Sequence, residues 1–340
     1  MPLNLQCFYM RFKVLMNNRI KKVFTLCTVW ALIYCSYSDA NPTKQLESAF
    51  ATSLVLTDGD SITLGFGDFD PQTIFNPQNT VNEEDSIALR KKLKLYSIPL
   101  KWQVNNPIYQ HNINVVSRIS YLNQSDFISL FDNVADDYIS ETVYNGMLGF
   151  NAEKALGSKW SYQFGLNTHY LHYNNDYDYN SPESRRNLKP LTDNLYTNLN
   201  SNALVLNPNA TMIYRLPRYW GYYEYKLNFN YYYGWALSHP DGIHNAAPET
   251  WRTLNGIKAT FNMFKIGPFE QAFYIKGQRI DLGGDSRVAF GTDHFYEYGI
   301  GFLWDAQRWT SWFNNFGIGI NIHNGSSLDG AAIVLYFNEI

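Results

Sequence analysis

Cysteine is almost absent from this sequence. The chain has 340 residues and three cysteines (Cys7, Cys27 and Cys35), all within the first 40 positions. Charged residues are also scarce at 17%, against about a quarter in ordinary soluble domains. The formal net charge of −3 lacks the basic excess that accompanies nucleic-acid binding. We therefore predict neither a disulfide framework nor a nucleic-acid partner.

Long apolar runs are missing as well. Mean hydropathy is −0.32, and outside the N-terminal segment no run approaches the roughly 18 apolar residues of a transmembrane helix. A bundle of membrane helices is therefore excluded. The sequence also has no phosphate loop, no dinucleotide fingerprint and no histidine pair at metal-binding spacing. We predict no cofactor, no metal and none of the common enzyme classes.

The N-terminal segment is typical of a secretory signal. Arg19, Lys21 and Lys22 precede an apolar stretch over 23–34, and Ser38-Asp39-Ala40 supplies a small-x-Ala cleavage site. A basic region, a short apolar region and such a site together predict a cleaved signal peptide. We predict that residues 1–40 are removed, with all three cysteines, and that 41–340 form one domain with a short N-terminal segment.

Alternation with a period of two dominates the rest of the chain. In 159–173 the residues Trp160, Tyr162, Phe164, Leu166, Thr168 and Tyr170 share one face, and polar residues share the other; 219–236 repeats the pattern. Such alternation indicates strands with one apolar and one polar face. These runs are two to three times longer than the usual five or six residues. Their length favours tilted strands that cross a membrane as a closed barrel, with a polar interior and aromatic girdles.

Twelve strands are predicted, an even number, which is typical of bacterial single-chain barrels. They are 51–67, 90–103, 108–122, 139–151, 159–173, 202–216, 219–236, 250–264, 269–282, 294–304, 310–323 and 330–340. The fold class is therefore all-β, a single twelve-stranded antiparallel transmembrane barrel. The prediction of the first strand rests on the expected even number of strands. The residues also allow other interpretations, because Thr57-Asp58-Gly59-Asp60 fits a hairpin turn and 41–56 fits a short segment inside the barrel.

Long and short connections alternate along the chain. The longest covers 174–201, whereas 104–107, 152–158, 217–218, 265–268 and 305–309 are short. Bacterial outer-membrane barrels keep short turns in the periplasm and long loops outside. This pattern predicts an outer-membrane protein of a Gram-negative cell with both termini in the periplasm.

The chain resembles the solitary outer-membrane autotransporter β-barrel family. The resemblance lies in the strand layout behind a signal peptide and in the run from Ser61 to Pro71 (SITLGFGDFDP). It implies an autotransporter-type translocator barrel that lacks a passenger, and it implies no catalytic residues. As partners we expect the barrel-assembly machinery during biogenesis and outer-membrane lipid and lipopolysaccharide afterwards, and we expect a monomer.

Charged residues within the strands are candidates for the barrel interior, because a lipid-facing Lys or Arg at mid-depth costs about 2–4 kcal/mol. The lumen-facing candidates are Glu224, Lys226, Arg252, Lys258 and Lys276. Arg279 shares the apolar parity of its strand but lies near a rim. The predicted function is structural or that of a narrow pore. A diffusion channel or substrate-selective porin is the alternative.

His323 and Ser326 suggest a second alternative, a lipid hydrolase at the outer rim of the barrel. Such enzymes use a serine nucleophile and a histidine base. The segment His323-Asn324-Gly325-Ser326 also spells a hairpin turn, since Asn-Gly is a favoured turn pair. The turn is the interpretation that we adopt.

Overall fold

The computed structural model describes residues 42–58, 62–64, 93–104, 111–131, 134–238, 243, 245–266, 269–305, 315–325 and 330–337. The predicted signal peptide lies outside these residues. Among the described helices, none combines the length and the apolar character of a membrane span.

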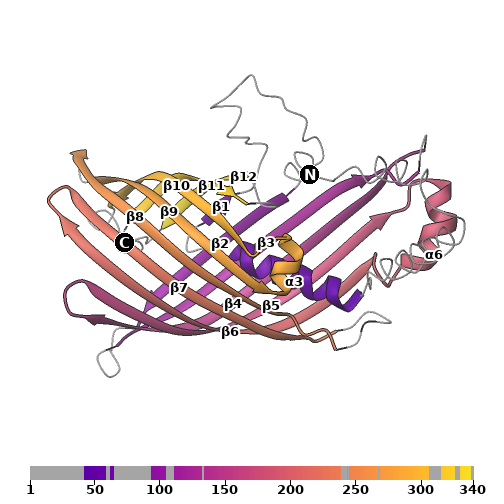
Figure 1. The fold of residues 1–340 in the computed structure, drawn as a ribbon, viewed down its shortest axis with the longest axis horizontal. Coiled ribbons are helices and arrows are strands. Elements are labelled where there is room, and N and C mark those ends of the chain that lie inside the picture. Colours follow the sequence, from indigo (N-terminus) through magenta and orange to yellow (C-terminus); the bar gives the residue numbers. More distant parts are fainter. Residues whose placement is uncertain are drawn as a thin grey trace, which may run out of the picture. The chain divides into compact units, whose positions relative to one another are not determined.

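Twelve antiparallel strands form a closed barrel, as predicted (Figure 1). They are β1 (Ile62–Leu64), β2 (Leu93–Gln103), β3 (Asn112–Ile128), β4 (Asp137–Leu156), β5 (Trp160–Asp178), β6 (Leu199–Arg218), β7 (Gly221–Ala236), β8 (Glu249–Ile266), β9 (Phe269–Gly284), β10 (His294–Asp305), β11 (Asn315–Asn324) and β12 (Gly330–Phe337). Each strand pairs with its sequence neighbours. The short strand β1 closes the ring, because Thr63 lies opposite both Val334 of β12 and Ser97 of β2.

The two faces of each strand alternate between burial and exposure. In β4, Val143, Asn145 and Met147 are buried, whereas Tyr144, Gly146 and Leu148, which alternate with them, are exposed. Successive side chains of a strand point to opposite faces of its sheet. The polar and smaller residues therefore line the inside of the barrel, and large apolar residues cover the outside.

The prediction of a strand over 51–67 was wrong. Residues Pro42–Thr57 form a helix, α3, and only Ile62–Leu64 pair as a strand. Leu46, Phe50 and Leu54 recur every four residues, which places them on one face of a helix. The number of strands is still twelve, because the short strand β1 takes the place of the longer strand that was predicted.

The start of α3 and the end of β12 lie at opposite edges of the barrel. The first turns of α3 contact the connection between β7 and β8, where Ala247 donates its backbone N–H to Glu47. That connection is one of the long ones. Strand β12 ends at the opposite edge, where Phe337 pairs with Phe316 near the start of β11. Within the described residues, α3 thus begins at the long-connection edge and β12 ends at the other edge, and the predicted periplasmic position of both termini stays a prediction.

The longest connection has a structure of its own. It carries a short π-helix, η1 (Ser184–Leu188), and a short α-helix, α6 (Lys189–Thr192), beyond the ends of the strands (Figure 1). Asp137 anchors its start, because the carboxylate accepts hydrogen bonds from Asn180 N at 2.8 Å and Tyr177 Oη at 3.0 Å. A third short helix, α7 (Asp285–Phe290), lies in the connection between β9 and β10.

Candidate functional site

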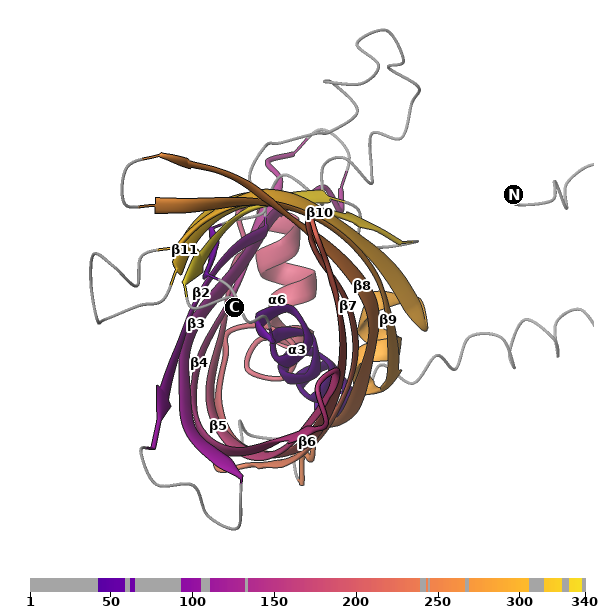
Figure 2. The same ribbon diagram turned by 90° about the vertical axis from the view of Figure 1, so that its left-hand side faces the viewer.

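Helix α3 lies inside the barrel, enclosed by the strands (Figure 2). Leu46, Phe50 and Leu54 are at most 1% exposed. They belong to one apolar cluster with inward side chains from β2 to β7 and from the β7–β8 connection: Leu95, Leu122, Val143, Leu171, Tyr173, Leu199, Ala203, Val205, Tyr232, Ala236, Ile243 and Ala246. Burying side chains of this size stabilises the folded state by about 1.5–3 kcal/mol each. The helix is therefore packed as a core element.

An ionic cluster holds the residue that follows the helix. The carboxylate of Asp58 lies 3.0 Å from Arg118 Nη1 and 2.6 Å from Arg252 Nη1. Arg252 also donates a hydrogen bond to the backbone carbonyl of Asp58 at 2.9 Å. Both arginine side chains are less than a tenth exposed. Two buried guanidinium groups on opposite walls thus depend on one carboxylate, and removing one partner of such a group is costly.

Hydroxyl and amide groups surround the last turn of α3. Ser97 Oγ donates to the carbonyl of Thr57 at 3.4 Å, and Asn145 Nδ2 donates to Thr57 Oγ1 at 3.1 Å. Asn145 Oδ1 lies 3.2 Å from Nδ1 of the buried His169. The last carbonyls of a helix have no partner within the helix. Here the barrel wall supplies one.

The first turns of α3 are held at the long-connection end. Glu47 Oε1 accepts the N–H of Ala247 at 2.8 Å, and Lys44 Nζ lies 2.6 Å from Glu47 and 3.5 Å from Asp285 of α7. The hydrogen bond with Glu47, opposed by partial burial and assisted by Asp285, raises the pKa of Lys44. The helix is thus fixed at both ends, by different elements.

Two further carboxylates hold charged groups on the inner wall, Glu224 near the short turn before β7 and Glu297 near the start of β10. Glu224 lies 2.6 Å from Arg215 and 3.7 Å from Lys258. Glu297 lies 2.7 Å from Lys276 Nζ. Glu297 also accepts hydrogen bonds from Gln278 and Asn321 at 2.8 and 3.2 Å. Each carboxylate therefore joins neighbouring strands through charge-assisted hydrogen bonds.

The five lumen-facing candidates lie on the same strand face as this network. Glu224 and Arg252 are each 7% exposed, and Lys226 is half-buried. Lys258 and Lys276 pair with Glu224 and Glu297 respectively. Arg279 lies on the outer face with Asp281. The sequence analysis did not identify the residues that form ion pairs with these candidates or with each other, which are Asp58, Arg118, Arg215 and Glu297. Arg118 could have been found, because it alternates with the outward, apolar Ile119 and so falls on the inner face.

Asparagine side chains form a chain of hydrogen bonds along the inner wall of β5 to β7. Asn167 donates to Asn207 at 3.0 Å, Asn207 to Asn230 at 3.4 Å and Asn230 to Asn228 at 2.5 Å. Glycine makes room for the amides. A Cβ on Gly165 would lie 2.0 Å from Asn151 Oδ1, and a Cβ on Gly149 would lie 2.0 Å from Asn167 Oδ1.

His323 points inward. Its Nε2 lies 2.7 Å from Glu297 Oε2, and the side chain is 10% exposed. Ser326 lies outside the described residues. The described chain also contains no group of three or more His, Cys, Asp or Glu residues that could hold a metal ion. His323 is therefore placed as a member of the ionic network around Glu297.

The outer face of the barrel is apolar over a wide band. Ile119 is 70% exposed, and Phe150 and Phe164 are each 60% exposed. From Trp160 to Tyr170 the outward residues of β5 cover about 25 Å at a rise of about 3.3 Å per residue and a tilt of about 40°. That height matches the apolar band of an outer-membrane barrel.

Aromatic rings border this band. Tyr96, Tyr121, Tyr144 and His172 follow one another across β2 to β5, with ring centroids 6.1, 5.2 and 6.1 Å apart. Toward the short turns, ring pairs lie 4.7–5.3 Å apart between neighbouring elements: Trp160 with Tyr214, Trp220 with Phe261, Phe273 with Phe302, and Trp304 with Phe316. Aromatic girdles mark the two membrane interfaces. The fold and this surface define a transmembrane β-barrel of the outer-membrane class.

The chain belongs to the family described as the solitary outer membrane autotransporter beta-barrel domain, whose profile matches residues 47–339. It is accordingly an outer-membrane protein. No curated protein matches the sequence.

Solved barrels align at low identity. The transport unit of the autotransporter AIDA-I from Escherichia coli is 13% identical with a TM-score of 0.46, over 87% of this chain and 97% of that one. The beta domain of the Bordetella autotransporter BrkA is 11% identical with a TM-score of 0.41, over 72% and 99%. LpxR from Salmonella typhimurium is 8% identical with a TM-score of 0.39, over 82% and 99%.

Proposed function

We propose that this protein is a non-catalytic outer-membrane barrel whose interior is closed at rest by α3. The observation that carries the proposal is the two-ended attachment of the helix. Asp58 holds one end between Arg118 and Arg252, and Glu47 holds the other end at Ala247. The apolar side chains between these attachments exclude water from the same section of the interior.

The ionic network supports a closed interior over an open pore. Glu224 and Glu297 each bind cationic side chains across neighbouring strands, so these long side chains pack against the inner wall. A twelve-stranded barrel is narrow enough for side chains and one helix to fill it.

We further propose that the long connections face the cell exterior. The start of α3 then lies at the cell surface, and the end of β12 lies in the periplasm. The protein would function as a monomer among outer-membrane lipid and lipopolysaccharide after insertion by the barrel-assembly machinery. Epitope tags placed before Pro42 and after Ile340 test this orientation. Antibody labelling of intact cells should detect the first tag and miss the second.

Planar-bilayer recording tests the closed state. The refolded chain 41–340 should give no steady conductance, and deletion of residues 42–58 should give stable current steps. Deletion of 185–191, in the longest connection, is the matched control and should leave the protein silent. A heat-dependent gel shift establishes folding of all three. Steady conductance of the intact chain, equal to that of the deletion, would contradict the proposal and favour a diffusion channel.

A further inference from the structure

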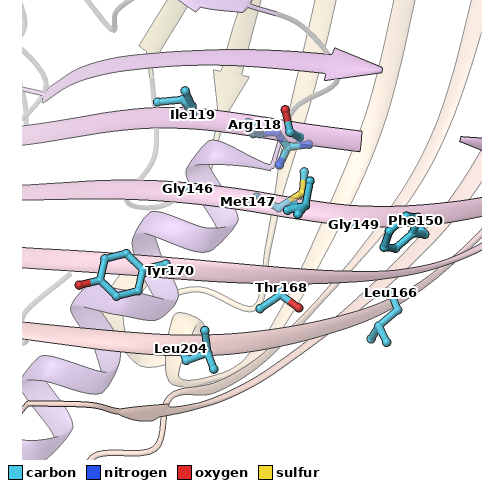
Figure 3. A pocket seen from close by; sticks show the side chains of 12 residues that line it. Arg118, Ile119, Gly146, Met147, Gly149, Phe150, Leu166, Thr168, Tyr170 and Leu204 are labelled. Atoms are coloured by element: carbon cyan, nitrogen blue, oxygen red, sulfur yellow. The ribbon is translucent and has the colours of Figure 1, made fainter. Parts of the chain in front are cut away.

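A groove interrupts the apolar outer face over β3 to β6. Its volume is about 600 Å³, and Ile119, Leu148, Phe150, Leu166, Tyr170 and Leu204 are among its walls. Figure 3 shows Phe150, Leu166, Tyr170 and Leu204 around it. These residues occupy outward positions of their strands, so the groove opens toward the membrane.

Small outward residues create the groove. Gly146 lies on β4 opposite Ile119 and Tyr170 of the neighbouring strands, and a Cβ placed on it would meet no heavy atom within 4 Å. One outward position further toward the short turns, the small residues Ser117 and Thr168 lie on the two strands beside β4. Open space therefore remains above the backbone, and an acyl chain of the bilayer can fill it.

A hydrogen bond keeps Tyr170 from filling that space. Its phenol donates to Asn202 Oδ1 at 3.0 Å, and Nδ1 of His172 lies 2.8 Å from the same oxygen. Asn202 is paired with His172, which is two residues further along β5 toward the long connections. The Tyr170 side chain therefore extends along the wall and borders the groove.

The groove lies within one leaflet of the membrane. His172 belongs to the aromatic border on the long-connection side, and Leu166 lies six positions before it on β5. Six steps of about 3.3 Å at a tilt of about 40° cover about 15 Å, which is half of the roughly 30 Å hydrocarbon core. The groove therefore reaches from this border to about the centre of the bilayer, in the leaflet nearer to the long connections.

A row of neutral polar side chains follows the aromatic border. Asn123, Thr142, Asn174 and Asn200 are paired in register across β3 to β6, one outward position beyond the border. Asn123 Nδ2 donates to Thr142 Oγ1 at 3.0 Å, Asn200 is exposed, and Asn174 donates to the next outward residue, Asp176, at 2.6 Å. The row is therefore continuous with the upper end of the groove on all four strands.

The chemistry of this row suits sugar hydroxyl groups. Amides and hydroxyls both donate and accept hydrogen bonds, and a carboxylate accepts them. Binding of a phosphate group is strongest with lysine or arginine, and the outward positions of β3 to β6 contain neither in the described half toward the long connections. The surface above the groove thus matches the saccharide part of a glycolipid.

We propose that the groove binds one acyl chain of a lipopolysaccharide molecule, whose sugars contact the row formed by Asn123, Thr142, Asn174 and Asn200. The choice of this lipid rests on the orientation proposed above, in which the long connections face the cell exterior and the groove lies in the lipopolysaccharide leaflet. One amphiphile then satisfies both parts of the site. Its acyl chain fills the open space at Gly146, and its sugar hydroxyls pair with the neutral side chains.

Native mass spectrometry tests the proposal on the refolded chain 41–340, delipidated and then exposed to equal amounts of deep-rough lipopolysaccharide and phosphatidylethanolamine. The intact protein should retain one lipopolysaccharide per barrel. Gly146→Leu should lower this retention about tenfold, because its side chain occupies the space of the acyl chain. Gly277→Leu is the matched control, since Gly277 lies outside the groove on the outer face of β9, opposite Ile257 and Tyr298, and should retain the lipid. A heat-dependent gel shift establishes that each variant folds.

The sugar contact has its own variant. Asn174→Ala combined with Asn200→Ala should keep one lipid bound but lose the preference for lipopolysaccharide. Equal retention by Gly146→Leu and the intact protein would overturn the groove as the site, and preferential retention of phosphatidylethanolamine would overturn the assigned occupant. The epitope tags described above measure the orientation separately. Reversed labelling of the tags would therefore contradict the orientation, whereas the binding assay in detergent judges the groove by itself.

Discussion

Asp58 and Arg252 are 194 positions apart in the chain, yet the Asp58 carboxylate lies 2.6 Å from Arg252 Nη1. This contact joins the residue after α3 to the wall formed by β8, and Arg118 joins the same carboxylate to β3. A single side chain therefore ties the interior helix to two distant parts of the barrel.

Asp58→Asn should destabilise the barrel by about 3–5 kcal/mol, because two buried arginines lose their shared counter-charge. Urea unfolding in detergent, followed by tryptophan fluorescence, measures the effect. Asp281→Asn is the control, since Asp281 pairs with the exposed Arg279 on the outer face and its loss should change stability much less. Equal effects from the two substitutions would show that Asp58 is not a structural anchor.

Two glycines on neighbouring strands should respond oppositely to alanine. Gly165→Ala places a methyl group 2.0 Å from Asn151 Oδ1, and this overpacking should cost about 1–3 kcal/mol. Gly146→Ala meets nothing within 4 Å and should stabilise by about 0.4–1 kcal/mol through a restricted unfolded chain. The same unfolding assay compares them. A Gly165→Ala variant as stable as the original chain would contradict the close packing of Asn151 against Gly165.

Glu47→Ala should loosen the first turns of α3, since Ala247 N loses its acceptor. Hydrogen exchange at Ala247 and at the amides of 44–50 should become faster, while the amides of β5 stay protected. Unchanged exchange at Ala247 would contradict this attachment.

The ion pair of Lys44 should not depend on pH in the neutral range. Its pKa is raised above 10.5 by the hydrogen bond with Glu47. The contribution of the pair is therefore complete below the unfolded-state pKa and is lost only as the pH rises through the higher folded-state value. Exchange protection corrected for intrinsic rates should stay constant around neutrality and fall in strong alkali. A fall near neutral pH would contradict the contact.

Lipid hydrolysis should be absent. His323 points inward and is bonded to Glu297 within a network that includes Lys276, so we expect it to support the wall. Incubation with phospholipid and with lipid A should give the same background for the intact chain, Ser326→Ala and His323→Gln. Faster release of fatty acid by the intact chain than by either variant would restore the hydrolase interpretation.

Sequence reasoning was reliable where one residue pattern repeats over a long strand. The alternation over 159–173 predicted β5, observed at Trp160–Asp178, because lipid and interior impose opposite polarity on successive residues. It failed at 51–67, where the four-residue spacing of Leu46, Phe50 and Leu54 was outweighed by the strand count. A helix inside the barrel packs its apolar residues against the wall. Its spacing of apolar residues alone therefore does not distinguish it from other buried segments.

The ionic partners were harder to predict than the strand faces. The alternation of polar and apolar residues is enough to place Arg252 on the inner face of its strand. That Asp58 is its ion-pair partner follows only from the position at which α3 ends inside the closed barrel. The shear of the barrel and the depth of the helix decide that contact. Neither quantity can be read from the pattern of polar and apolar residues.

Disulfide trapping tests the position of α3 most directly. Thr57 Oγ1 and Asn145 Nδ2 lie 3.1 Å apart, and residues 41–340 contain no cysteine. Thr57→Cys with Asn145→Cys, oxidised in isolated outer membranes, should cross-link and shift the gel mobility of the unfolded chain. Ser97→Cys with Ser120→Cys, between adjacent strands whose hydroxyls lie 2.9 Å apart, is the positive control. A control pair that cross-links beside a helix pair that does not would contradict the placement of α3 inside the barrel.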